Sequence, residues 1–565
     1  MGTKLSPHTQ KITLVEIDFG QVQTLFFNWT AGVWYVDFDA IYSLIDPVYL
    51  VGVSAQPGIS VVGSVRENGA ALASQANVAN CVSTVSSYYY DTIDRRLYIH
   101  LSNGSEPSIK TVMIGVTTGI SNLACNYNSM YYEPRLRSAP AIGKTKDPLF
   151  FGRTSFDGGT IGIDNEDGGF DSIVSGALWG GAVRILQGFD TDAYGSFLKM
   201  AAGVIESVQI TRDLVSMTII DKRKNLSRMA PRRVFDVGTY PNISYYNLGK
   251  PIPLAYGLLY NVPCVCVNEE ATAPTTWDFK ICDCTDHAIV SIDQIYSDGF
   301  KVTATTSSMA NGTFSLNGAD FTVGTQVTAD IHGYATTNAA DVILSLMLDY
   351  LAIPYNATYF NTTEWAAATA LAMNVGLFVN NATEVFSIIE DICNSSMLNM
   401  IQQDDGRYTL RAYNAARAID QILNTDELLG NPTIDYDTTA IISSTLVGYN
   451  RNWALGSFKH VHDTTSESAI FSTYNVYRER EFQTLLTSDA DAQIFSTAML
   501  ALYGHVTTKI TARFKLQPVE RELMDFVMLP VFRQAKPIMG SVKCEIYSIS
   551  KDLLAAQVSL GCRLV

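Results

Sequence analysis

The chain has 565 residues, of which 47% are hydrophobic and 17% are charged, and its formal net charge is −16. This acidic balance argues against a protein that holds nucleic acid through a basic surface. The length predicts three to five domains, and the hydrophobic content is enough for large buried cores.

The sequence contains no stretch that reaches the ~18 uninterrupted apolar residues of a membrane-spanning helix. The longest candidate, residues 366–379, is interrupted by Thr369, Asn374 and Gly376. We therefore expect no stable insertion into a membrane. The acidic charge leaves one role toward DNA open, because a channel lined with negative charge lets DNA pass without binding it.

Residues 1–134 predict an N-terminal β domain. Residues 24–30 are aromatic and β-branched, and residues 34–38 alternate between apolar and polar. Residues 88–91 and 97–101 lie on either side of a polar turn, which predicts a β-hairpin.

Strand patterns separated by glycine-rich turns continue through residues 135–250, which we predict to be a second β domain. Residues 204–211 and 214–220 are its clearest pair of strands. The segment 249–257, rich in proline and glycine, predicts a domain boundary.

A small β domain is predicted over residues 251–332. Its strands are short, and the dipeptides Asp298-Gly299 and Asn317-Gly318 predict the turns between them.

Helical periodicity is found only after residue 335. Thr337 or Asn338 can cap a helix that runs from residue 339 to about 351, and a second helix is predicted over residues 383–393. A hairpin around Asp405-Gly406 follows. These elements predict an α/β insert domain over residues 333–415.

Residues 416–565 return to strand patterns, with a single predicted helix at residues 489–503. The predicted fold class is therefore mainly β and multidomain, with a smaller β+α part.

The segment 160–171, TIGIDNEDGGFD, has the composition of a calcium-binding loop. With Gly168 at the sixth position of such a loop, Ile163 and Val174 would occupy the first and twelfth positions, and neither can bind a cation. The preceding residues also alternate like a strand. The sequence therefore predicts a polar turn in a hairpin.

Two Cys-x-Cys pairs give the sharpest metal signal. Residues two apart on a strand share a face, so paired strands could bring four thiolates together for zinc or an iron–sulfur cluster. The alternative is four small buried residues in a hairpin, and the spacing differs from the usual two intervening residues. The candidate quartet is Cys264, Cys266, Cys282 and Cys284.

No catalytic motif stands out. Residues 142–145 resemble part of a phosphate-binding loop, but Ser138 replaces the glycine that such a loop needs. His460, His462 and Asp463 lack a third imidazole nearby and are interpreted as a polar loop. There is no Gly-x-Ser-x-Gly elbow. We expect a protein that is not an enzyme.

Several segments taken together resemble the tail-tip and baseplate hub proteins of long-tailed bacteriophages. Residues 159–171 are similar to a strand followed by the Asn-x-Asp-Gly-x-Phe-Asp hairpin of that family. Residues 247–257 are similar to its Gly-x-Pro-Ile-Pro-x-x-Tyr-Gly segment. The helices at 339–351 and 383–393 follow its α/β insert. At residues 524–527 the chain has Met-Asp-Phe-Val where hub proteins often have Gly-Asp-Val-Val.

The resemblance implies two tube-like β-barrel domains, at residues 135–250 and 416–565, with smaller β and α/β domains inserted between them. Three such chains would place six barrels in a ring, which would continue a six-fold tail tube and offer three-fold symmetry to a tip. The implied partners are two further copies of the chain in a homotrimer, a tail tube or distal tail protein, a central tip or fibre protein, the tape-measure protein, and passing DNA that is not bound specifically. The implied location is the distal end of the virion tail.

Two alternatives belong to other classes. One is a tail-tip enzyme that degrades cell-wall or surface glycan, which paired carboxylates in a cleft would favour. The other is an adhesin that uses the N-terminal β region, which exposed Trp29 and Trp34 on one face would favour.

Overall fold

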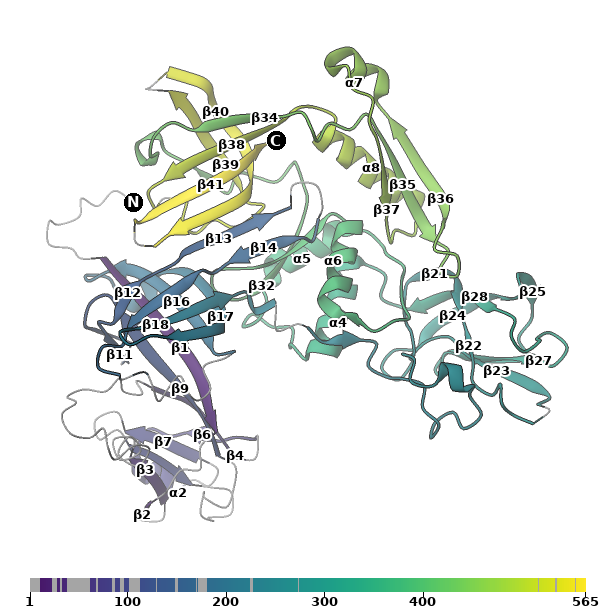
Figure 1. The fold of residues 1–565 in the computed structure, drawn as a ribbon, viewed down its shortest axis with the longest axis horizontal. Coiled ribbons are helices and arrows are strands. Elements are labelled where there is room, and N and C mark those ends of the chain that lie inside the picture. Colours follow the sequence, from purple (N-terminus) through teal and green to yellow (C-terminus); the bar gives the residue numbers. More distant parts are fainter. Residues whose placement is uncertain are drawn as a thin grey trace.

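The computed structural model describes residues 11–565, except for a set of short segments. These segments are 23–27, 31–32, 38–60, 68–69, 84–86, 92–95, 101–111, 129, 148–150, 169, 171–179, 224–226, 273, 517, 534–535 and 554. The described residues form several sheets with a few helices set among them (Figure 1). The mainly β, multidomain fold class is therefore confirmed.

The largest sheet has 11 described strands, and its centre is the antiparallel run β9–β1–β16–β17–β18. Because β1 pairs with both β9 and β16, the boundary predicted at residue 134 falls within this sheet. Its strands are β1 (Lys11–Val22), β4 (Val61–Glu67), β5 (Ala70–Ala71), β9 (Val112–Ser121), β10 (Cys125–Tyr127), β11 (Met130–Glu133), β12 (Leu136–Ser138), β15 (Thr160–Asp164), β16 (Ala182–Phe189), β17 (Leu198–Ile210) and β18 (Leu214–Ile220).

A second sheet has eight described strands, six of which come from the C-terminal part of the chain. The other two, β13 and β14, come from the first half: β13 pairs with β40 from Ala141 opposite Asp552 to Thr145 opposite Ser548. The strands are β13 (Ala141–Lys146), β14 (Thr154–Asp157), β33 (Gln421–Ile422), β34 (Thr433–Asp437), β38 (Thr507–Phe514), β39 (Phe526–Arg533), β40 (Lys536–Asp552) and β41 (Gln557–Leu564).

One hydrophobic core is common to the two large sheets. Strand side chains alternate between faces, so β18 buries Val215, Met217 and Ile219 while its intervening residues are only partly buried. These residues belong to the same buried cluster as Ile510 and Phe514 of β38. The two sheets therefore pack against each other, and Figure 1 shows β18 and β38 on the same side of the molecule.

A five-stranded sheet lies next to the β4 and β9 end of the 11-stranded sheet and contains the predicted hairpin (Figure 1). β7 and β8 pair from Ser87 opposite His100 to Asp91 opposite Arg96, as expected. Helix α2 (Val78–Ser83) was not predicted, and the expectation that helices begin only after residue 335 is wrong; six residues are too short to display a helical period. The strands are β2 (Asn28–Thr30), β3 (Val33–Asp37), β6 (Ala73–Ser74), β7 (Ser87–Asp91) and β8 (Arg96–His100).

The described residues in the middle of the chain form an insert with two main sheets, three helices and a hairpin. Asp298 and Gly299, both with positive φ, make the predicted turn between β24 and β25. The six-stranded sheet contains β20 (Leu254–Tyr256), β21 (Leu258–Pro263), β24 (Ile289–Ser297), β25 (Phe300–Val302), β28 (Val327–Tyr334) and β29 (Leu377–Val379). The four-stranded sheet contains β22 (Val265–Cys266), β23 (Thr276–Lys280), β26 (Thr306–Ser308) and β27 (Thr313–Asn317).

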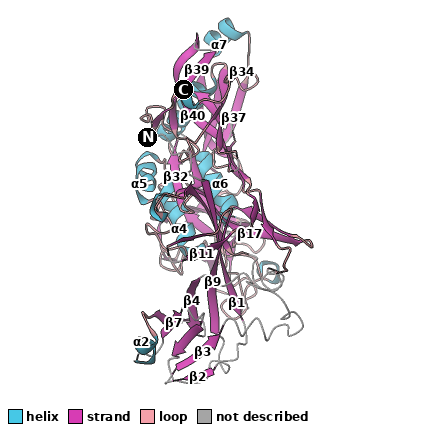
Figure 2. Ribbon diagram, turned by 90° about the vertical axis from the view of Figure 1, so that its left-hand side faces the viewer, coloured by secondary structure: helices cyan, strands magenta, loops and turns pink. Residues whose placement is uncertain are grey.

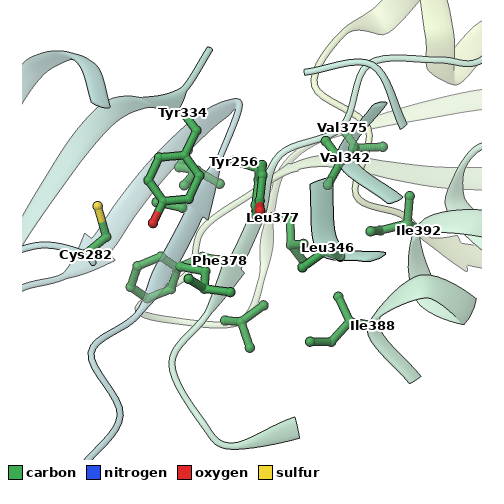
Figure 3. Packing of buried hydrophobic residues seen from close by; sticks show 14 of the residues in the cluster. Tyr256, Cys282, Tyr334, Val342, Leu346, Val375, Leu377, Phe378, Ile388 and Ile392 are labelled. Carbon is green, nitrogen blue, oxygen red and sulfur yellow. The ribbon is translucent and has the colours of Figure 1, made fainter. Parts of the chain in front are cut away.

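Helices α4 (Ala339–Leu351), α5 (Thr362–Leu371) and α6 (Val385–Ser395) complete the insert, with the hairpin of β31 (Leu398–Gln402) and β32 (Tyr408–Ala412). The side chain of Asn338 accepts a hydrogen bond from the Ala340 amide at 3.0 Å, so the predicted cap of α4 is confirmed. Figure 3 shows Val342 and Leu346 of α4 on the side of Ile388 and Ile392 of α6, with Tyr256 and Tyr334 to the left of them. Residues 383–384 form β30 (Thr383–Glu384) with β19 (Met229–Ala230), so α6 begins two residues later than predicted.

The chain then forms a small sheet of β35 (Ser444–Arg451), β36 (Phe458–Thr465) and β37 (Glu479–Gln483), with helices α7 (Glu467–Tyr474) and α8 (Asp489–Tyr503). Helix α8 has the predicted bounds, and Ser488 caps it by accepting from the Asp491 amide at 3.1 Å. In the side view the molecule is elongated, with α7 and the strands β2 and β3 at opposite ends (Figure 2). Among the described residues, no helix is both long and apolar enough to cross a membrane.

Candidate functional site

The acidic turn after β15 is neutralised by two arginines. Arg135 donates to both carboxylate oxygens of Asp167, at 2.8 and 2.5 Å. Arg137 donates to Asp164 at 3.0 Å and pairs with Glu166. Because each of these carboxylates faces a guanidinium group, the segment is a polar turn, as predicted.

The backbone of this turn is fixed by Asn165, which is buried. Its side chain accepts a hydrogen bond from the Phe170 amide at 2.8 Å, and its carbonyl accepts from the Gly168 amide at 2.9 Å. Gly168 has φ of 67°, a conformation that glycine adopts without strain. Residues 171–179, which follow the turn, lie outside the described residues, so the hairpin itself stays a prediction.

The structure brings together two of the four cysteines of the predicted quartet. The Sγ atoms of Cys282 and Cys284 are 3.7 Å apart, whereas Cys266 donates to the Asn268 side chain at 3.5 Å. The register of β22 against β23 pairs Cys266 with Phe279, so Cys266 does not lie opposite Cys282 or Cys284. In the described part of the chain, no three His, Cys, Asp or Glu side chains are grouped to hold a metal ion. Metal or an iron–sulfur cluster at Cys264, Cys266, Cys282 and Cys284 stays a prediction.

His460, His462 and Asp463 lie on strand β36, so the interpretation of this segment as a loop is wrong. The strand is largely exposed, which explains why its sequence is polar. The ring of His460 stacks on Tyr449, with 5.3 Å between centroids. His462 Nδ1 lies 3.0 Å from Asp489 Oδ1, a contact that ties β36 to the start of α8.

Lys144, in the segment weighed as a phosphate loop, lies on strand β13 and is buried. Its ammonium is 2.8 Å from Asp404 and 2.7 Å from Glu522, and it donates to the Gln402 carbonyl at 2.9 Å. Lys551 of β40 also pairs with Asp404. Burial by itself would lower the pKa of Lys144, but the two carboxylates outweigh burial and raise it. This cluster ties β13 to the β31–β32 hairpin and to the segment before β39.

Lys146, two residues along the same face of β13, forms a second buried cluster. Its ammonium is 2.8 Å from Glu545 of β40, and Arg563 of β41 also pairs with Glu545. Burial alone would raise the pKa of Glu545, but the two cations lower it to about 2. The pKa of Lys146 is lowered by burial and by Arg563 against the opposing pull of Glu545, since one carboxylate serves two cations.

In the insert, a serine, an aspartate and a histidine are linked by hydrogen bonds. These are the residue types of a hydrolase catalytic triad, but they are linked in a different order. Asp349 accepts from Ser345 at 2.9 Å and lies 2.8 Å from His287 Nε2. In a catalytic triad the histidine lies between the serine and the acid, so that it can remove the serine proton. Here the acid lies between the other two, and the arrangement provides no activated nucleophile.

No protein-family model matches the chain, and no curated protein matches it. Among solved structures it is similar to the tail protein from Neisseria meningitidis MC58, with 11% identity over 78% of this chain and 95% of that chain and a TM-score of 0.39. It is also similar to the 43 kDa tail protein of prophage MuSo2 from Shewanella oneidensis, with 9% identity over 77% of this chain and 94% of that one and a TM-score of 0.35. A chain of the gene transfer agent virion is 11% identical, with 59% of this chain and 88% of that chain covered and a TM-score of 0.39.

By their descriptions, these three structures are tail or virion proteins.

The buried charges of β13 were not predicted from the sequence. A signal was present, because residues 142, 144 and 146 share one face of a strand and Ile142 is buried. Two lysines on that face indicate buried carboxylate partners. The partners themselves are far away in the sequence: Glu522 lies 378 residues beyond Lys144.

Proposed function

We propose that the chain is a structural protein of the virion tail that acts as the tail hub. In this role it closes the distal end of the tail tube, adapts the six-fold tube to a three-fold tip and forms part of the channel for the ejected DNA. Three copies would form a ring whose partners are the tube or a distal tail protein, the tape-measure protein and a central tip or fibre protein.

The observation that carries the proposal is that two large sheets within one chain pack on one shared hydrophobic core. Strand β13 comes from the first half of the chain but lies in the C-terminal sheet, and both sheets contribute to one core. One chain therefore presents two sheet units as a single body, and three chains would present six. The net charge of −16 suits a channel that must not retain DNA.

Immunogold labelling of particles tests the location. With an antibody raised against the purified chain, we expect label only at the end of the tail farthest from the head. Label along the tail or on the head would contradict the proposal. Particles that lack this chain serve as the control for antibody specificity.

A further inference from the structure

Cys282 and Cys284 differ from the other two cysteines of the candidate quartet in what their sulfur atoms contact. Their Sγ atoms lie 3.7 Å apart and share a hydrogen bond. The thiols of Cys264 and Cys266 instead donate to oxygen atoms, at 3.5 Å in each case. The contacts therefore separate one pair from the quartet and make it a candidate for chemistry between the two sulfurs.

The residue between the two cysteines is held from several sides. The amide of Asp283 donates to the carbonyl oxygen of Pro253 at 2.7 Å, and its own carbonyl accepts from the hydroxyl of Tyr334. Its carboxylate accepts from Arg233 and from the hydroxyl of Thr285, at 2.8 Å in both cases. These contacts fix the short segment that carries both sulfur atoms.

A glycine packs directly against the pair. Gly312 has φ of 58°, in the region that favours glycine. A Cβ atom at this position would lie 2.6 Å from Sγ of Cys284 and 3.4 Å from Sγ of Cys282. The first of these distances is well inside the ordinary separation of two heavy atoms in contact, so the absence of a side chain at residue 312 leaves room for the two sulfurs.

The two thiols are not equivalent. Cys282 is fully buried, whereas Cys284 is partly exposed. The hydrogen bond from Cys282 lowers the pKa of the Cys284 thiol against the opposing effect of burial, and the charge of Lys280 acts in the same direction as the hydrogen bond. The same hydrogen bond and burial raise the pKa of the Cys282 thiol. A sulfur with thiolate character beside a buried thiol is the arrangement of a reacting cysteine and its resolving partner.

We propose that Cys282 and Cys284 form a reversible disulfide when the chain meets hydrogen peroxide. The sulfur of Cys284 attacks one peroxide oxygen, the O–O bond breaks, and the hydroxide that leaves takes the proton of the Cys284 thiol to form water. The sulfur of Cys282 then attacks the resulting sulfenic acid, whose hydroxyl group leaves with the proton of the Cys282 thiol as a second water. Two thiols and one peroxide thus become one disulfide and two waters.

The small size of the loop suits a reversible modification. A bond across one intervening residue constrains the unfolded chain little, so it can form and break without a large change in the stability of the fold. Thiols stay reduced inside a cell, and disulfides persist outside it. A virion protein would therefore keep the pair reduced during assembly and oxidise it after release. This timing rests on the proposed function, whereas the contact between the sulfurs and its chemistry do not.

Peptide mass spectrometry of the full-length chain tests the modification. The reduced chain is treated with hydrogen peroxide, the remaining thiols are blocked with N-ethylmaleimide, and trypsin then releases residues 281–301, which contain both cysteines of the pair. We expect this peptide to lose two hydrogens at least about tenfold faster than the peptide with Cys264 and Cys266 loses its free thiols, and dithiothreitol to reverse the change. No disulfide within residues 281–301, a bond to Cys264 instead, or a tightly bound metal ion that keeps all four thiols reduced would overturn the proposal.

Two variants and one control assign the roles of the two sulfurs. Cys282→Ser removes the resolving thiol and should leave a sulfenic acid on Cys284 that dimedone traps. Cys284→Ser removes the reacting thiol and should slow the oxidation of Cys282 at least about tenfold, because Cys282 is buried. Cys266→Ser lies in the same insert but outside the pair, and should leave disulfide formation unchanged.

Circular dichroism checks the folding of each variant. Dimedone labelling of Cys282→Ser that does not exceed labelling of the unaltered chain would overturn the assignment of Cys284 as the reacting thiol. Loss of the disulfide in a folded Cys266→Ser chain would overturn the pairing itself.

Discussion

The joint between the eight-stranded sheet and the β31–β32 hairpin is built from a different kind of side chain than the core of the insert. At the joint, Lys144 and Lys551 are buried with Asp404 and Glu522. In the insert, α4 and α6 meet through aliphatic residues such as Leu346 and Ile392 (Figure 3). Trp365 of α5 packs against Phe360 in the same core.

The difference shows how each region achieves its geometry. Apolar packing stabilises a core but tolerates small shifts, whereas a buried ion pair is satisfied in only one arrangement. A buried ion pair adds little net stability, yet removing one partner is costly because the other charge is left uncompensated. The joint therefore fixes the position of the β31–β32 hairpin against the eight-stranded sheet, whereas the two large sheets meet through the hydrophobic core that they share.

The largest effect is expected from breaking the joint. Lys144→Met removes one of the two cations that serve Asp404 and Glu522, and should lower the free energy of unfolding by about 4 to 5 kcal/mol. Denaturant unfolding measures it, with Lys199→Met, an exposed lysine on β17, as the control. If the two variants were equally stable, the buried cluster would have no role in holding the β31–β32 hairpin against the eight-stranded sheet.

Truncating a buried leucine in the insert core gives the matching comparison for an apolar contact. Leu346→Ala on the buried face of α4 should cost about 3 to 4 kcal/mol. Leu348→Ala on the same helix is the control, because Leu348 is 39% exposed. A loss for Leu348→Ala as large as that for Leu346→Ala would mean that the insert core differs from the one described.

The pH dependence of stability distinguishes the second buried cluster, around Glu545, from the apolar core of the insert. The pKa of Glu545 is lowered to about 2 in the folded chain, below its ordinary value of 4.5. A depressed pKa means that this carboxylate stabilises the fold above about pH 4.5 and that the contribution is lost as the pH falls toward 2. The contribution is roughly 3 kcal/mol.

Denaturant unfolding at a series of pH values measures the contribution of Glu545. Glu545→Gln should remove the steepest part of the loss of stability on acidification, whereas Leu346→Ala should shift the whole curve down without changing its slope. An unchanged acid slope in Glu545→Gln would contradict the assignment.

The smallest effect is expected at the acidic turn after β15. Arg137 is exposed, and surface ion pairs of this kind contribute little. Arg137→Ala should leave the melting temperature unchanged within error. A large drop would show that this turn, like the joint, depends on its charges.

The elements predicted correctly from the sequence are those whose own residues show a cap or a periodic apolar pattern. Helix α4 was found from its cap at Asn338 and its buried period, and helix α8 from residues 489–503. Helix α5 was missed because its only buried residues are Trp365 and Ala368, too few to form a visible stripe. The buried clusters of β13 could not be completed from the sequence, because pairing Lys144 with Glu522 requires the tertiary fold.

Electron microscopy of the purified chain tests the tail-hub proposal most directly. The account predicts a three-fold ring with six sheet units around an open pore wide enough to pass duplex DNA, with acidic residues toward the pore. A compact monomer with a deep acidic cleft would contradict ring formation by the chain itself and favour a tail-tip enzyme or adhesin.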